Sequence, residues 1–198
     1  MLQQTSRDLK FLGTEFELDE FGAVLRRRLG RHVCDTRVIF SLVQELGDTQ
    51  QATAACAVLQ YAQQQNLEIN VYLVSATMNV CRKSSAWRQS LHVLREMSDG
   101  RVEGDTIICN VAVSSCEKGG QWWQALQLLR EMSRSCVERN TVTFNAAVSA
   151  CEKGGQWWQA FQLLREMADS RVGRDTITCN AAVSACEKGE QWVWALQL

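Results

Sequence analysis

The fold of this chain is decided by residues 141–167, TVTFNAAVSACEKGGQWWQAFQLLREM. Nearly the same letters occur 35 residues upstream, and a comparison of residues 106–140 with 141–175 finds 24 identical positions in 35. More diverged copies flank this pair, at 71–105, at 36–70 and from Thr176 onward. Self-similarity at one fixed period indicates a repeat protein, in which each unit packs against its neighbours.

Within a unit the apolar residues follow helical spacing. Residues 108–118 are predicted to form one helix, which ends at Lys118 and the following Gly119-Gly120 pair. A second helix is predicted from about Gln121 to Ser133, with an apolar stripe of Trp122, Ala125, Leu126, Leu129 and Met132. Leu128 lies off that stripe, so this helix is apolar on two sides, as suits a stacked array. Trp122 and its counterparts Trp157 and Trp192 are expected in the core.

The predicted fold class is all-α, a right-handed α-solenoid of stacked helical hairpins with a 35-residue repeat. Residues 1–35 are expected to form a partly helical N-terminal cap. The repeats follow in order: a degenerate one at 36–70, three well-formed ones at 71–105, 106–140 and 141–175, and a truncated one at 176–198. Because no unit follows the last one, we expect a fragment or truncated gene product. Its apolar surface is expected to favour self-association, through Trp192, Val193, Leu196 and Leu198.

Composition and charge narrow the classes of function. The 198 residues carry a formal net charge of -1, which disfavours sequence-blind binding driven by phosphates, and duplex DNA is not an expected partner. No apolar run approaches the roughly 18 residues of a membrane span, so no membrane association is expected. Acidic residues in the first 34 positions argue against an organellar transit peptide: Asp8, Glu15, Glu17, Asp19 and Glu20.

The chemistry-bearing residue types point to no metal, cofactor or catalytic centre. The nine cysteines show no CxxC spacing, and we expect reduced thiols. Cys109 and Cys116 lie seven residues apart on one helix face, about 10 Å along the axis, which is too far for a shared zinc ion. Core packing is the favoured interpretation. The recurring Glu117-Lys118 pair is interpreted as a helix end rather than an acid–base pair, so no enzymatic activity is expected.

The repeat at 141–175 resembles the pentatricopeptide repeat family. Phe144-Asn145 matches that family's aromatic-Asn pair in the first helix, Lys153-Gly154 matches its helix end, and Ala, Leu and Met follow through the second helix. The tetratricopeptide repeat differs, because its period is 34 and it requires a Leu-Gly pair where this chain has Ala-Val-Ser. The resemblance covers residues 36–198 and is strong from residue 71 onward.

This resemblance implies recognition of single-stranded RNA, one base per repeat. The implied base-reading pairs are Ser75 with Asp105, Asn110 with Asn140, and Asn145 with Asp175, which by the family's code suggest 5′-GCU-3′. Asn180 occupies the same column of the truncated repeat. The residues implied to sandwich each base are Tyr72, Ile107, Val142 and Ile177. Recurring lysines could approach phosphates: Lys83, Lys118, Lys153 and Lys188. The degenerate repeat has Phe40 with Asn70 in the reading columns and is interpreted as a cap or spacer.

Several interpretations stay open at this stage. The lysines could instead interact with the C-terminal ends of their own helices. Trp123 and Trp158 form a strip that either packs between second helices or binds a protein partner. The family's Gly and Pro in the bend after the second helix are replaced here by Arg101, Cys136 and Arg171 and by Gly104, Arg139 and Arg174. The favoured function is RNA binding in organellar RNA processing or expression, in a mitochondrion or plastid; the alternative is a scaffold that binds a peptide or a partner helix.

Overall fold

The computed structural model describes residues 18–29, 35–67, 69–99 and 106–195, and every regular element in these ranges is a helix. The chain divides into two compact units, Met1–Val102 and Glu103–Leu198. The first contains α2 (Leu18–Leu29), α3 (Thr36–Asp48), α4 (Ala52–Gln64), α5 (Val71–Lys83) and α6 (Trp87–Asp99). The second contains α7 (Thr106–Lys118), α8 (Trp122–Arg134), α9 (Thr141–Lys153), α10 (Trp157–Asp169), α11 (Thr176–Lys188) and α12 (Trp192–Ala195).

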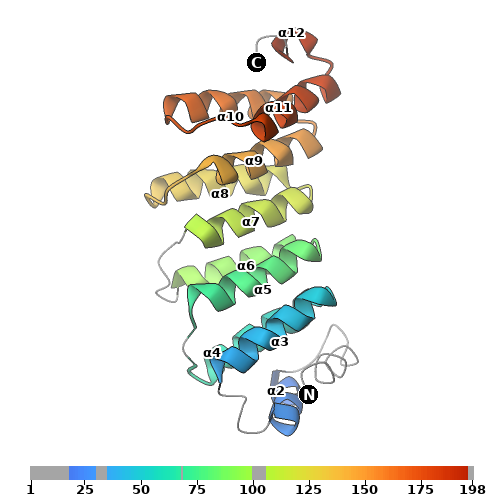
Figure 1. Ribbon diagram of the computed structural model, residues 1–198, viewed down its shortest axis with the longest axis vertical. Helices are drawn as coiled ribbons and strands as arrows, with labels where there is room; N and C mark the ends of the chain where they lie inside the picture. Colours follow the sequence, from blue (N-terminus) through green and yellow to red (C-terminus); the bar gives the residue numbers. More distant parts are fainter. Residues whose placement is uncertain (1–17, 30–34, 68, 100–105, 196–198) are drawn as a thin grey trace. The chain divides into compact units, whose positions relative to one another are not determined.

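Each unit is a stack of helical hairpins. In the second unit, the first helices α7, α9 and α11 pack side by side, while α8 and α10 each pack against the first helix of their own hairpin and that of the next (Figure 1). The first unit repeats this arrangement with α3, α4, α5 and α6, and α2 packs against α4. The predicted all-α fold of stacked hairpins is therefore confirmed. None of the described helices is long and apolar enough to cross a membrane.

The turn inside each hairpin requires one residue in the left-handed region. Gly120 and Gly155 supply it with φ of 67° and 66°, as expected from the Gly-Gly pairs. In the other described hairpins the same place holds Gln50, Ser85 and Glu190, with φ between 54° and 56°. Glycine is thus not the general means of ending the first helix, because packing of the hairpin offsets the cost of a Cβ in this conformation.

The bend after the second helix keeps its left-handed residue although glycine is absent. Cys136 and Arg171 adopt φ of 54° and 56°, and Arg101 lies outside the described residues. Arg139 then anchors the segment before α9: its guanidinium pairs with Glu166 of α10 and lies 5.4 Å from the ring centroid of Phe144. The chain therefore reaches the start of α9 through this bend without the Gly and Pro that the resembled family has there.

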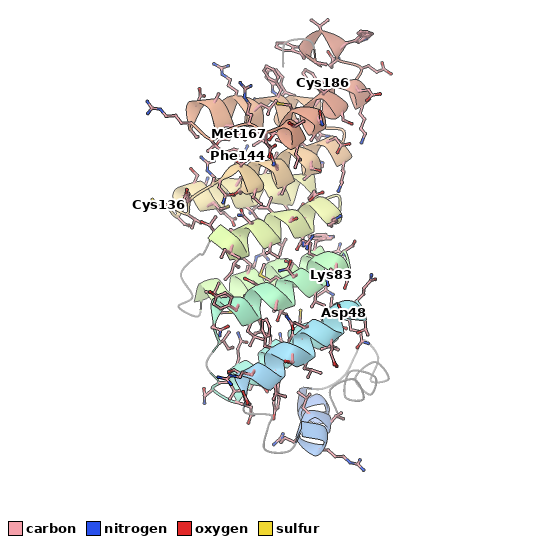
Figure 2. The ribbon with its side chains drawn as sticks, in the orientation of Figure 1. Asp48, Lys83, Cys136, Phe144, Met167 and Cys186 are labelled. Atoms are coloured by element: carbon pink, nitrogen blue, oxygen red, sulfur yellow. The ribbon has the colours of Figure 1, made fainter. Side chains whose placement is uncertain are left out.

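Cys136→Gly is expected to raise the free energy of unfolding by about 1 kcal/mol, because glycine adopts this φ without the steric cost that a Cβ brings. Cys136 is exposed at the end of α8, so no packing is lost (Figure 2). Denaturant unfolding of both proteins measures the change. Cys136→Ser keeps the Cβ and should leave stability unchanged; a glycine variant less stable than wild type would contradict the strain argument.

The core of the second unit is built from the predicted columns. Phe144 and Met167 are fully buried (Figure 2), and so are Cys116 and Cys151, whose pKa burial raises to about 12. These thiols stay protonated and act as small apolar residues. In the first unit Cys56 Sγ and Cys81 Sγ lie 3.6 Å apart on α4 and α5. Within the described residues, no cluster of His, Cys, Asp and Glu could hold a metal ion.

Tryptophan contacts between hairpins differ from the expectation of a buried column. Trp122 and Trp157 are only half-buried, and Trp192 is 64% exposed, so the core assignment was wrong for the last of them. The Trp122 ring lies against Gly154, at the end of the next hairpin's first helix: a Cβ built there would lie 2.8 Å from Trp122 Cγ and closer still to Cδ1. Trp157 lies against Gly189 in the same way. These glycines are needed for close approach rather than for φ, which is -83° at Gly154.

The first unit shows the alternative to this tryptophan–glycine contact. The tryptophan column holds Ala52, and the glycine column holds Ser84. The Ser84 hydroxyl donates to the Gln50 carbonyl at 3.0 Å, in the turn that precedes Ala52. A large side chain therefore occurs opposite glycine and a small one opposite serine.

Candidate nucleic-acid interface

The implied base-reading pairs of the second unit meet in space. Asn110 and Asn145 lie on α7 and α9, and their partners Asn140 and Asp175 are the N-cap residues of α9 and α11. Asn145 Nδ2 donates to Asp175 Oδ2 at 2.9 Å, and Asn110 Nδ2 donates to Asn140 Oδ1 at 3.4 Å. Asn140 and Asp175 are the last residues of their repeats, and each caps the first helix of the next repeat. That helix packs against the first helix of the cap residue's own repeat, so the cap lies beside the asparagine on it.

Capping fixes the side chains of Asn140 and Asp175. Thr143 N–H donates to Asn140 Oδ1 at 3.1 Å, and Thr178 N–H donates to Asp175 Oδ1 at 2.8 Å. Asn and Asp are favoured at this position because their oxygens satisfy N–H groups that the first helical turn leaves without partners. The Thr178 backbone N–H, then the Thr178 hydroxyl and the Asn145 amide, hold the pKa of Asp175 below its ordinary value. Asp175 is therefore an ionised group that only accepts hydrogen bonds.

Thr143 and Thr178 belong to the same constellation, which sequence reasoning missed. The Thr178 hydroxyl donates to Asn145 Oδ1, and the Thr143 hydroxyl donates to Asn110 Oδ1. Both threonines are fully buried. The available signal was the recurrence of Thr two positions before Asn145 and Asn180, in a column that otherwise reads as apolar because it holds Leu73 and Ile108.

The other residues that the resemblance implies as base readers are not paired in this way. Ser75 lies half-buried on α5, and its hydroxyl has no hydrogen-bond partner within the described part of the chain. Asp105, its expected partner, lies outside the described residues. Ser75 lines a groove of about 630 Å³ between α3 and α5, together with Phe40, Tyr72 and Asn79. Asn180 is exposed on α11.

The residues implied to sandwich bases share one surface column. All four are large apolar side chains that are more than half exposed: Tyr72 75%, Ile107 54%, Val142 61% and Ile177 65%. Each lies near the start of a first helix, in the turn that also carries the reading residue. Their exposure leaves flat apolar surface beside the polar pairs.

The recurring lysines form ion pairs between successive hairpins. Lys153 Nζ lies 2.6 Å from Glu117 Oε1, and Lys188 Nζ lies 2.6 Å from Glu152 Oε1. Lys83 Nζ lies 3.7 Å from Asp48 Oδ1 (Figure 2). Lys118 is exposed and makes no ion pair among the residues described. Each also lies in the last turn of its helix. A role in phosphate contact stays a prediction, and for three of these lysines it requires exchange of an existing carboxylate partner.

The tryptophan strip is partly packed and partly open. Trp158 is 43% exposed and lies 6.0 Å from Phe161 and 6.1 Å from Trp194, between ring centroids, so it does pack toward the next hairpin. Trp123 is 52% exposed, with the Arg130 guanidinium 6.0 Å from its ring centroid. Trp192 and Val193 are exposed on α12, whereas Leu196 and Leu198 lie outside the described residues. Binding of a protein partner and self-association stay predictions.

Comparisons with known proteins agree with the fold of repeated helical hairpins. A family model described as PPR repeat matches residues 107–137 and 142–172. Among solved structures, the pentatricopeptide repeat protein PPR10 from maize matches 99% of this chain and 36% of its own length, with 15% identity and a TM-score of 0.59. The PPR domain of Arabidopsis thaliana protein-only RNase P 1, solved in complex with tRNA, matches 81% of this chain and 85% of that domain, with 10% identity and a TM-score of 0.68.

These likenesses have defined limits. At 10% and 15% identity the two solved structures show a shared fold. The chain spans about a third of the length of the maize protein. No curated protein matches it in sequence.

Proposed function

The chain is a pentatricopeptide repeat protein, with repeats at residues 107–137 and 142–172, and on that premise we propose that it binds single-stranded RNA sequence-selectively. The observation that carries the proposal is the convergence of Asn110 with Asn140 and of Asn145 with Asp175, each beside exposed apolar side chains. The tRNA complex of the Arabidopsis domain supports RNA as the ligand class.

The chemistry of the two pairs distinguishes pyrimidines. Asp175 offers only acceptors, and its carboxylate keeps lone pairs beyond those used by Thr178 and Asn145, so it suits the N3–H donor of uracil. Asn140 turns its oxygen toward the Thr143 N–H, and its Nδ2 makes no hydrogen bond within the described residues. That amino group suits the N3 acceptor of cytosine. Together with Ser75 and Asp105 for guanine, the proposed core is 5′-GCU-3′, one base per repeat.

Affinity comes mainly from apolar contact rather than from charge. The exposed column of Tyr72, Ile107, Val142 and Ile177 provides surfaces against which bases can pack. The net charge of -1 and the carboxylate-paired lysines predict a shallow dependence of affinity on salt. From the family resemblance we also propose that the chain acts in organellar RNA processing or expression, in a mitochondrion or plastid, as a binder and not as an enzyme.

The test is a competition binding experiment with a short single-stranded RNA that contains GCU. Because each packed or hydrogen-bonded base contributes about 1 to 3 kcal/mol, the double variant Asn110→Ala/Asn145→Ala is expected to lose at least about tenfold in affinity. Gln127→Ala, on the exposed face of α8, is the matched control and should bind like wild type.

Two outcomes would contradict the proposal. Equal binding of GCU and scrambled RNA by wild type would remove sequence selectivity. Absence of RNA binding, combined with capture of a peptide that Trp123→Ala and Trp158→Ala abolish, would establish the scaffold function in its place.

A further inference from the structure

We propose that Thr143 and Thr178 are positioning residues for base choice: each sets the amide orientation of the reading asparagine in the preceding repeat. The inference rests on the proposed RNA-binding function and deepens it. A base would then be selected by three side chains rather than two, with the third contributed by the next hairpin. Thr143 contacts the Asn110–Asn140 pair, and Thr178 contacts the Asn145–Asp175 pair.

At the Asn145–Asp175 pair, donors and acceptors can be satisfied in only one arrangement. The carboxylate accepts and cannot donate, so the NH₂ group of Asn145 must face it, at 2.9 Å. The Asn145 oxygen then faces the Thr178 hydroxyl, which donates to it. The Thr178 backbone N–H occupies the other carboxylate oxygen at 2.8 Å. One amide N–H and one oxygen lone pair of Asn145 remain available to a base, and the positions of this donor and this acceptor are fixed.

At the Asn110–Asn140 pair Thr143 has a larger effect on the amide orientation, because two amides can pair in either direction. The Thr143 backbone N–H holds the oxygen of Asn140 inward at 3.1 Å. The Thr143 hydroxyl donates to Asn110 Oδ1, which leaves Asn110 Nδ2 directed to Asn140 Oδ1 at 3.4 Å. Without this hydroxyl, no other group described here would hold the oxygen of Asn110 in place.

Burial shows that the threonines act through the asparagines and not on the base. Thr143 and Thr178 are fully buried, whereas Asn110 and Asn145 are partly exposed. A buried hydroxyl that lies under the reading residue cannot reach a base on the surface. It can restrict how the residue above it presents its donor and acceptor.

The columns of the sequence support the same assignment independently. Where the reading residue is an asparagine with a complete pair, the next repeat has threonine at its third position: Asn110 with Thr143 and Asn145 with Thr178. Where the reading residue has no amide to orient, that position is apolar: Phe40 with Leu73 and Ser75 with Ile108. Leu73 still donates its backbone N–H to the Asn70 cap at 2.9 Å, so capping alone does not require the hydroxyl.

The experiment measures selectivity with two RNAs that differ only in the base facing Asn145 and Asp175, uracil or cytosine. Thr178→Val removes the hydroxyl with little change of shape. The carboxylate still sets which end of the Asn145 amide faces it, but the Asn145 oxygen loses its donor and is no longer held in place. The ratio of the two affinities is expected to fall about tenfold, the value of one hydrogen bond. Thr178→Ser retains the hydroxyl and should retain the ratio. Thr141→Val is the matched control, because it removes a hydroxyl that donates to the Gly173 carbonyl at 3.1 Å, away from the reading pair.

The ratio of affinities tests the role of the threonine separately from the stability of the protein and from the proposed RNA-binding function. A ratio of affinities for two RNAs is independent of the folded fraction, so a less stable Thr178→Val protein still gives a valid result. A wild type that prefers uracil and a Thr178→Val variant with the same preference would overturn the role of the threonine while leaving RNA reading intact. A wild type that binds both RNAs equally would overturn the proposed reading itself, and the role of the threonine with it.

Discussion

Gly154→Ala is expected to lower the free energy of unfolding by about 3 kcal/mol, an unusually large effect for a single methyl group. The cause is the Trp122 ring, whose Cγ would lie 2.8 Å from the new Cβ, with Cδ1 closer still. Tryptophan is too bulky to move aside without losing its contact with the next hairpin. The backbone conformation is not the cause, because φ at Gly154 is -83°, which alanine adopts readily. Denaturant unfolding monitored by circular dichroism gives the change.

The first unit indicates which pair of substitutions should recover part of the lost stability. There the two columns hold Ala52 and Ser84, so the double variant Trp122→Ala/Gly154→Ser reproduces a pair that already occurs in this chain. It should be less destabilised than the sum of its two single variants by about 1 to 3 kcal/mol. Gly173→Ala is the matched control, since its Cβ would meet nothing within 4 Å. A Gly154→Ala protein as stable as Gly173→Ala would show that Trp122 does not limit this position.

Asp175→Asn is expected to reverse the base preference of its repeat from uracil to cytosine. The substitution replaces Oδ2, which accepts from Asn145 Nδ2, with an NH₂ donor. The remaining oxygen still caps α11 through the Thr178 N–H and is expected to accept from Asn145 as well, as Asn140 Oδ1 accepts from both Thr143 and Asn110. Asn140 already combines these features in the preceding repeat, where its oxygen accepts from Thr143 N–H. If each preference is about tenfold, the ratio of affinities for the two RNAs changes by about a hundredfold.

The reciprocal variant Asn140→Asp provides the matched comparison. It should change the preference of its own repeat from cytosine to uracil and leave the neighbouring repeat unaltered. Binding to a set of four RNAs, with uracil or cytosine at each of the two positions, separates the contributions. Loss of affinity for all four RNAs, without a change in their ranking, would indicate that these residues support the fold and do not read bases.

Much of the architecture could be predicted because it follows from local patterns. Helical spacing and the Gly-Gly pair predict α7 and α8 to within two residues at each end. The resemblance also assigns the columns that hold Asn145 and Asp175, and the structure brings these two side chains into contact. That they read bases stays a prediction. The left-handed residues at Ser85 and Cys136 could not be predicted, because nothing in their residue types favours that conformation.

By itself the sequence determined the repeat, its helical hairpins and the residues that align in each column, because those properties depend on spacing along one chain. Only the tertiary structure decided which columns touch. Trp122 meets Gly154, Glu117 meets Lys153, and Thr178 meets Asn145. The partners in each pair stand 32 to 36 residues apart and occupy different columns. A period identifies equivalent positions, but it carries no information on the offset at which one hairpin packs against the next. That offset is set by the shapes of the side chains between them.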